Sequence, residues 1–214
     1  MTARRKGFFI SFEGGDGAGK SSQIGRLADE LRRRGKTVRV TREPGGSDGT
    51  ETIRKLLVEG AAERWSPMAE ALMMYAARAD HLERVIRPAL DRGEVVITDR
   101  FADSSMAYQG IAGALGEQPV SRLHALVVGE DDPDITIILD VPIDVGLARA
   151  GGRGAAESRF ESKGSAYQEK VRQAFLKIAR DNPKRCVIVD ATPDEETVFK
   201  SVAAAVERAL QSRA

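Results

Sequence analysis

The sequence predicts an α/β fold of three layers, in which helices cover both faces of a five-stranded parallel sheet. Two observations predict it: five apolar, β-branched segments are nearly continuous, and each is followed by a stretch with helical spacing. The five segments are Phe8–Phe12, Val38–Val40, Val95–Thr98, Ile135–Val141 and Cys186–Val189. The chain has 214 residues and no clear interdomain linker, so we expect residues 1–214 to form a single domain.

Composition and charge exclude several classes of function. The net charge is +1, so no overall basic field argues for a nucleic acid or an anionic membrane as partner. The apolar runs are far below the ~18 residues of a membrane span, and the one after the basic start MTARRKG is too short for a signal peptide. The single cysteine, Cys186, excludes an internal disulfide and fits a reducing compartment. We therefore expect a cytoplasmic protein that binds neither nucleic acid nor membrane.

The first predicted strand leads directly into a glycine-rich turn. Gly14-x-x-x-x-Gly19-Lys20-Ser21 matches the phosphate-loop pattern, with a strand before it and a helix after it. Glycines let backbone N–H groups curl around an anion, and the helix start adds unpaired N–H donors. Lys20 brings a compact charge to the β- and γ-phosphates, and the Ser21 hydroxyl can bind Mg²⁺.

This turn and the helix start after it predict a fold of the phosphate-loop NTPase type that binds ATP and Mg²⁺. The residues expected to bind ATP are Gly14, Gly15, Asp16, Gly17, Ala18, Gly19, Lys20, Ser21 and Ser22.

The second strand also ends in polar residues. The first helix is expected to end near Gly35, and the strand then delivers Arg42 and Glu43 before Pro44 stops it. Ligands of doubly wound sheets bind at the carboxyl ends of the strands, so both residues are site candidates, although a plain turn would look similar. Arg54 follows on a short helix, away from the apolar face of that helix.

A long amphipathic helix is predicted next. Ser66 and Pro67 are typical of a helix start, and apolar residues keep helical spacing to about Gly93, most of them in the core. Arg78 lies one turn after Met74. On spacing alone, Arg78 is expected at the surface rather than at a ligand.

The third strand ends in Asp99 and Arg100. A carboxylate at the end of a strand near a phosphate loop is suited to hold Mg²⁺ or one of its waters, and the arginine could clamp a second phosphate. The next segment carries hydrogen-bonding groups of the kind that read the edge of a base: Ser104, Ser105, Tyr108 and Gln109.

Residues 146–163 combine glycines with three arginines, Arg149, Arg153 and Arg159. Such a segment suits a lid that closes over phosphates, excludes water and supplies charge to the transition state. A solvated loop is the alternative.

Taken together, these motifs resemble those of the bacterial thymidylate kinases over nearly the whole chain. They are Gly14–Ser21, Thr41–Gly46, Tyr75–Arg78, Asp99–Phe101 and Asp103–Gly110. The Arg-Glu-Pro-Gly-Gly and Tyr-Gln-Gly elements are not shared by nucleotide kinases generally, and the sequence has no guanine-reading Asn-Lys-x-Asp of a GTPase. The resemblance implies a homodimer that transfers the γ-phosphoryl group of MgATP to dTMP, giving dTDP and ADP.

The resemblance also implies roles for individual residues. Asp16 should contact the 3′-hydroxyl of the deoxyribose, and Tyr108 should crowd the 2′ position of the sugar. Arg100 and Arg54 should hold the dTMP phosphate, with Glu43 near that phosphate and its metal or water.

The thymine edge should face Arg78, Ser105 and Gln109. Relatives usually have a phenylalanine stacked on the base at the position of Met74. A thioether can still pack against a ring, which is worth about 0.3–1.5 kcal/mol, but it lacks the flat face that fixes the plane of the base.

Members of this family place the catalytic arginine either in the phosphate loop or in the lid. The loop positions Gly15–Ala18 hold no arginine, so the chain resembles the lid-arginine kind, with Arg153 as first choice for the transition-state contact and Arg149 as second. The expected catalytic residues are Lys20, Arg100, Arg153, Arg149 and Asp16. Two alternatives remain: another nucleotide or nucleoside kinase on the same scaffold, and a non-catalytic nucleotide-binding switch.

Overall fold

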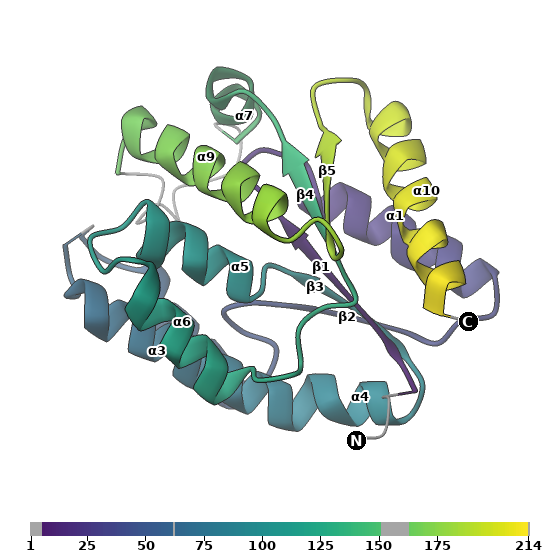
Figure 1. Ribbon diagram of the computed structural model, residues 1–214, viewed down its shortest axis with the longest axis horizontal. Helices are drawn as coiled ribbons and strands as arrows, with labels where there is room; N and C mark the ends of the chain where they lie inside the picture. Colours follow the sequence, from purple (N-terminus) through teal and green to yellow (C-terminus); the bar gives the residue numbers. More distant parts are fainter. Residues whose placement is uncertain (1–5, 62, 151–162, 214) are drawn as a thin grey trace.

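The fold is built on a sheet of five parallel strands in the order β2-β3-β1-β4-β5 (Figure 1). The computed structural model describes residues 6–61, 63–150 and 163–213. The strands are β1 (Phe8–Glu13), β2 (Val38–Arg42), β3 (Val95–Asp99), β4 (Ile135–Asp140) and β5 (Cys186–Asp190). Each begins at the residue that the sequence predicts, and the predicted α/β class with a five-stranded parallel sheet is confirmed.

Helices cover both faces of this sheet. Those of the described residues are α1 (Lys20–Arg33), α2 (Asp48–Val58), α3 (Pro67–His81), α4 (Arg87–Asp91), α5 (Ala102–Ser105), α6 (Glu117–Val127), α7 (Ile143–Ala150), α9 (Ser165–Asp181) and α10 (Glu195–Arg213), with π-helical turns η1 (Leu82–Ile86) and η2 (Met106–Ile111). Helices α1 and α10 lie side by side on one face, and α3, α4, α6 and α9 lie on the other (Figure 1).

The alternation of side chains along β1 explains the two cores. Phe8, Ile10 and Phe12 point to the face covered by α1 and α10, whereas Phe9 packs with residues of α3, α4 and α6 on the opposite face. Both sides of the strand are therefore buried, which is why it reads as a continuous apolar run.

The strand register brings three loops to one edge of the sheet. Phe12 of β1 is paired with Asp99 of β3, and Arg42 of β2 is paired with the same residue. The Arg100 N–H donates to the Phe12 carbonyl at 2.9 Å, and the Glu43 N–H donates to the Asp99 carbonyl at 2.9 Å. The ends of β1, β2 and β3 thus converge where a doubly wound sheet binds its ligands.

The long helix differs from the sequence-based expectation because it is interrupted by η1, a π-helical turn just before Pro88, which has no N–H to continue the helical hydrogen bonds. Leu72 of α3 is one of its apolar residues that lie outside the core, with 50% of its surface exposed. Ser66 caps α3 as predicted, by accepting the Ala69 N–H at 3.3 Å. None of the helices described here is long and apolar enough to cross a membrane.

A partly buried ion pair fixes the short helix α5 to the sheet. The Arg185 guanidinium donates two hydrogen bonds to the Asp103 carboxylate, at 2.6 and 2.8 Å. The Thr136 hydroxyl of β4 also contacts Asp103, at 3.3 Å. This anchor lies directly beside Ser104 and Ser105, so it positions candidate site residues.

Replacing Arg185 with Met should lower the free energy of unfolding by about 3 kcal/mol. This value is at the low end for a broken buried pair, because 21% of the Arg185 side chain is in contact with solvent. The loss arises because the Asp103 carboxylate remains buried without its cation. Urea denaturation measures the effect. Lys177→Met, which breaks exposed pairs with Asp181 and Glu117, is the control and should change stability far less. Equal losses in both variants would contradict the prediction.

Candidate active site

The phosphate loop connects β1 to α1, and its glycines are required by close backbone contacts. Gly17 has a φ of 75°, and a Cβ atom there would lie 1.9 Å from the Gly146 carbonyl oxygen. Gly14 has a φ of 131°, and a Cβ atom would lie 2.4 Å from the Leu139 carbonyl oxygen. Any other residue at these positions would push the loop away from β4 and α7.

Lys20 begins helix α1 and lies inside the curve of this loop. Its Nζ donates to the Gly14 and Gly15 carbonyls, at 3.1 and 2.9 Å. Burial lowers the pKa of Lys20, with the nearby Arg100 guanidinium as a second cause. The ammonium is thus held in place by backbone oxygens while its charge is poorly solvated, which favours an added anion.

Asp99 and Ser21 lie next to each other at the mouth of the loop. The Ser21 hydroxyl is 3.4 Å from Asp99 Oδ2, and Asp99 Oδ1 is buried with no hydrogen-bond partner in the described part of the chain. A hydroxyl and a carboxylate with a spare oxygen suit Mg²⁺, which takes few protein ligands and completes its shell with phosphates and water.

Arg100 bridges the phosphate loop and the segment after β3. It has a φ of 69°, which is rare for a residue with a side chain. Its guanidinium donates to Asp16 Oδ1 at 2.8 Å, to the Gly14 carbonyl at 3.1 Å and to Ser104 Oγ at 3.2 Å. The guanidinium carbon also lies 5.2 Å from the centre of the Tyr108 ring. Arg100 and Asp16 are therefore fixed relative to each other.

Arg78 is fully buried, so the expectation from spacing that it lies at the surface is wrong. Its Nε donates to Glu43 Oε2 at 2.8 Å, and the second Glu43 oxygen lies 3.0 Å from His81 Nδ1. The guanidinium also donates to Ser105 Oγ at 3.0 Å and to the Phe101 carbonyl at 3.2 Å. Burial is possible because these partners, distant in sequence, satisfy most of its donors.

The buried polar atoms without a hydrogen-bond partner among the described residues include Nη1 of Arg78 and Oε1 of Gln109. Buried polar atoms are nearly always hydrogen-bonded, so a donor and an acceptor left open beside a cavity indicate a ligand.

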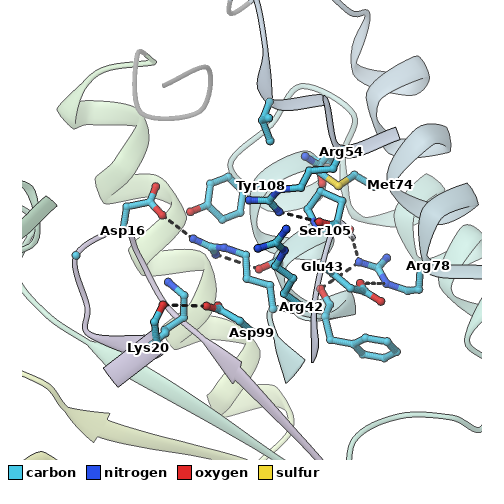
Figure 2. Close-up of a pocket in the computed structure, with 18 of the residues that line it drawn as sticks. Asp16, Lys20, Arg42, Glu43, Arg54, Met74, Arg78, Asp99, Ser105 and Tyr108 are labelled. Atoms are coloured by element: carbon cyan, nitrogen blue, oxygen red, sulfur yellow. Dashed lines mark hydrogen bonds and ion pairs between the residues drawn. The ribbon is translucent and has the colours of Figure 1, made fainter. Parts of the chain in front are cut away.

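These residues line one cavity of about 390 Å³. Its lining is Asp16, Gly17, Gly19, Lys20, Ser21, Arg42, Glu43, Pro44, Arg54, Val58, Met74, Arg78, Asp99, Arg100, Phe101, Ser104, Ser105, Tyr108 and Gln109. Figure 2 shows Asp16, Lys20 and Asp99 on one side of it and Met74, Arg54 and Arg78 on the other. The cavity thus joins an anion-binding loop to a second, arginine-rich half.

Some predicted residues lie elsewhere. Arg149 of α7 donates to the Ala191 and Thr192 carbonyls, at 2.7 and 3.1 Å, and does not line the cavity. Gly14, Gly15, Ala18 and Ser22 belong to the loop and helix start without lining it. Arg153, Arg159 and most of the predicted lid lie outside the described residues.

Glu13, at the end of β1, is a residue that the sequence reasoning missed: it does not line the cavity but holds Phe101 and Ser104, which do. Its carboxyl accepts the Phe101 N–H at 2.7 Å and the Ser104 hydroxyl at 2.6 Å, and it is completely buried. Burial raises the pKa of Glu13 to about 8, and the nearby Asp103 carboxylate adds to the rise. An acidic residue at the end of an apolar strand was the available signal, because a buried carboxyl needs a structural or functional reason.

Fold and site together define the class of this protein, a phosphate-loop kinase whose cavity continues from the phosphate loop into an arginine-rich half. The thymidylate kinase family model matches residues 12–202. Thymidylate kinase of Caulobacter vibrioides is 56% identical over 205 residues, a match that covers 96% of this chain and 98% of the Caulobacter chain. Thymidylate kinase of Dinoroseobacter shibae is 50% identical, and the match covers 92% of this chain and 95% of the Dinoroseobacter chain. The chain belongs to the thymidylate kinase family.

The comparison of structures agrees. The crystal structure of thymidylate kinase from Ehrlichia chaffeensis matches with a TM-score of 0.77 and 31% identity, covering 94% of this chain and 98% of that one. The activity is that of the family: phosphorylation of dTMP with ATP, a step of nucleotide biosynthesis.

The raised pKa of Glu13 makes a prediction for the pH dependence of stability. The pKa of this carboxyl rises on folding from 4.5 to about 8, so the folded state binds the proton more tightly. The contribution of Glu13 to stability is therefore complete at low pH and is lost as the pH rises through about 8. Glu13→Gln, which mimics the neutral acid, should flatten the fall in the free energy of unfolding between about pH 5 and about pH 9.

Urea denaturation at several pH values measures this slope. Asp134→Asn is the control, since Asp134 likewise accepts a backbone N–H of β1, from Phe9 at 2.8 Å, but at the far end of the strand. It should leave the slope as in the unmodified chain. A Glu13→Gln variant with an unchanged slope would show that Glu13 does not titrate in this range.

Proposed function

We propose that the γ-phosphoryl group of MgATP passes directly, in line, to the phosphate of dTMP, with no covalent intermediate on the enzyme. One observation carries this mechanism: the lysine of the phosphate loop and the arginines Arg54 and Arg100 line the same cavity. Two anions held there would meet end to end. Phosphoryl transfer asks the protein mainly to position the two phosphates and to neutralise the charge that develops between them.

On the donor side, the loop amides and Lys20 hold the phosphates of ATP. Ser21 and Asp99 would hold Mg²⁺, directly or through water. The fit rests on the open Oδ1 of Asp99, and no cluster of three or more acidic, histidine or cysteine side chains occurs among the residues described. The phosphates must therefore complete the metal shell. Bound Mg²⁺ supplies charge neutralisation at the transferred group.

On the acceptor side, Arg100 and Arg54 hold the dTMP phosphate, and Asp16 contacts the 3′-hydroxyl. Support comes from the Arg100–Asp16 ion pair of 2.8 Å and from Arg54, which donates to the Pro44 carbonyl at 2.7 Å beside the cavity. Tyr108 crowds the 2′ position of the sugar, and its ring lies against the Arg100 guanidinium that holds the phosphate. Glu43 acts through Arg78 rather than at the metal, since Arg78 and His81 engage its two oxygens.

The base lies between Met74 and the open polar atoms of Arg78 and Gln109. Thymine offers an acceptor at O4 and a donor at N3–H, which match the open Nη1 of Arg78 and the open Oε1 of Gln109. Ser105 supports Arg78 by accepting a hydrogen bond from its Nη2. Met74 packs against the ring.

We propose one domain, residues 1–214, in which residues 146–163 act as a lid. A cytoplasmic location fits the single cysteine, Cys186, a buried free thiol.

We also propose a homodimer that uses the face of α3 and α6. These helices lie side by side (Figure 1), and they carry three exposed large apolar side chains: Met68 at 42%, Leu72 at 50% and Leu126 at 81%. Exposed apolar side chains grouped on packed helices are typical of a protein interface.

The substrate assignment is tested with a coupled assay across dTMP, dUMP, dCMP, dGMP and thymidine. We expect ADP formation that depends on dTMP, with thymidine inactive because it brings no phosphate for Arg100 and Arg54. Turnover that requires another acceptor would favour a different kinase on this scaffold. ATP binding without any acceptor-dependent turnover would favour a non-catalytic switch.

The lid arginine is tested by Arg153→Ala. Because this arginine is proposed to meet the transferring phosphoryl group only in the transition state, kcat should fall by roughly 10³-fold or more while ATP affinity changes little. Steady-state kinetics and ATP titration measure the two effects. Arg149→Ala is the comparison, and near-normal turnover of Arg153→Ala beside a large loss in Arg149→Ala would reassign the role.

The dimer is tested by Leu126→Asp. A charge at this exposed site should separate the protomers without unfolding them, because the side chain supports no core of its own protomer. Light scattering after gel filtration measures the mass. Ile188→Asp, at a 44% exposed position on β5, should stay dimeric. A monomeric unmodified chain, or a dimeric Leu126→Asp variant, would refute this interface.

A further inference from the structure

The side-chain amide of Gln109 has two ends in different surroundings. Its Nε2 donates to Glu70 Oε1 at 2.8 Å, whereas its Oε1 is buried with no partner in the described residues. Gln109 is only 3% exposed and lines the cavity. The amide oxygen is therefore the end left for a ligand.

Glu70 determines which end of the Gln109 amide is left for a ligand. It lies in the first turn of α3, is 5% exposed, and does not itself line the cavity. An ionised carboxylate only accepts hydrogen bonds, so it takes the NH₂ end of the amide and leaves the oxygen for the cavity. The two ends of an amide are nearly equal in shape, so without such a partner either orientation would fit the same space.

The neighbouring donor is fixed as well. Nε of Arg78 donates to Glu43, and its Nη2 donates to the Phe101 carbonyl and to Ser105. Nη1 is left open. Arg78 and Gln109, both in the cavity lining, thus leave one donor group and one acceptor open. A 4-oxopyrimidine offers the complementary pair, O4 and N3–H, but a 4-aminopyrimidine offers an amino donor and an unprotonated N3 acceptor. Cytosine would meet donor with donor and acceptor with acceptor.

We propose that Glu70 is a specificity-determining positioning residue: by holding the Gln109 amide in one orientation, it makes the site accept thymine and reject cytosine. This inference rests on the proposed function, because it requires the base to lie against Arg78 and Gln109. Glu70 acts through Gln109 and does not touch the substrate.

The test is Glu70→Gln, which can hold Gln109 by either end. The ratio of kcat/KM for dTMP to that for dCMP should fall by about tenfold or more. The reason is that a Gln109 amide turned the other way can donate a hydrogen bond to the unprotonated N3 of cytosine. The KM for ATP, measured at saturating dTMP, should stay as in the unmodified chain. Asp134→Asn is the control: it also turns a carboxylate that accepts an N–H into an amide, at the far end of the sheet, where Asp134 is in addition paired with Arg213.

A folded Glu70→Gln variant with an unchanged ratio would overturn the proposal. If this variant does not fold, Glu70→Asp replaces it: the shorter side chain withdraws the acceptor from Gln109, and the ratio should fall in the same direction. A further arm uses the Gln109→Leu background, in which there is no amide to orient. There Glu70→Gln should leave the ratio unchanged, and a fall equal to that in the unmodified background would show that Glu70 acts by another route.

The unmodified chain separates this inference from the function on which it rests. If it phosphorylates dTMP and dCMP equally well, the base assignment fails and Glu70 has no selectivity to impose. If it strongly prefers dTMP and Glu70→Gln keeps that preference, the inference about Glu70 fails alone.

Discussion

The site depends on a carboxyl buried directly beneath an anion-binding loop. Glu13 ends β1 and accepts the Phe101 N–H and the Ser104 hydroxyl, and Ser104 in turn accepts a hydrogen bond from Arg100. These bonds fix the backbone just after Arg100, whose left-handed conformation would otherwise be strained. The rise in the pKa of Glu13 reflects the cost of burying its charge. A neutral acid is also the form that repels bound phosphates least.

The same logic extends to the arginines. A net charge of +1 gives no global attraction for nucleotides, so the cations must be concentrated and held locally. Arg100 is held by Asp16, and Arg78 by Glu43, which His81 contacts from the other side. Each arginine is therefore oriented before a ligand arrives, and little of its binding energy is lost in ordering long side chains.

What the sequence could predict follows from how local each feature is. The inner strands β1, β3 and β4 were predicted well because a parallel strand buried on both faces is a continuous apolar run. The phosphate loop was predicted well because its eight positions are contiguous. The burial of Arg78 could not be derived from spacing, since its partners Glu43 and Ser105 come from other elements. Glu13 and Glu70 were missed for the same reason. Their partners lie 88 and 39 residues away in the chain.

Charge cannot by itself select the acceptor, because every nucleoside monophosphate carries the same phosphate. Selection must come from groups that contact the base. In the proposed orientation these groups are Arg78 Nη1, Gln109 Oε1 and the apolar side chains of Met74 and Val58. An unpaired buried polar group costs about 1–3 kcal/mol, and cytosine would leave two of them mismatched at once. Uracil matches both, so its rejection falls to these apolar side chains, where one methyl group is worth about 1–3 kcal/mol. In that orientation the site would be strict about the hydrogen-bonding edge of the pyrimidine and more tolerant of its 5-substituent.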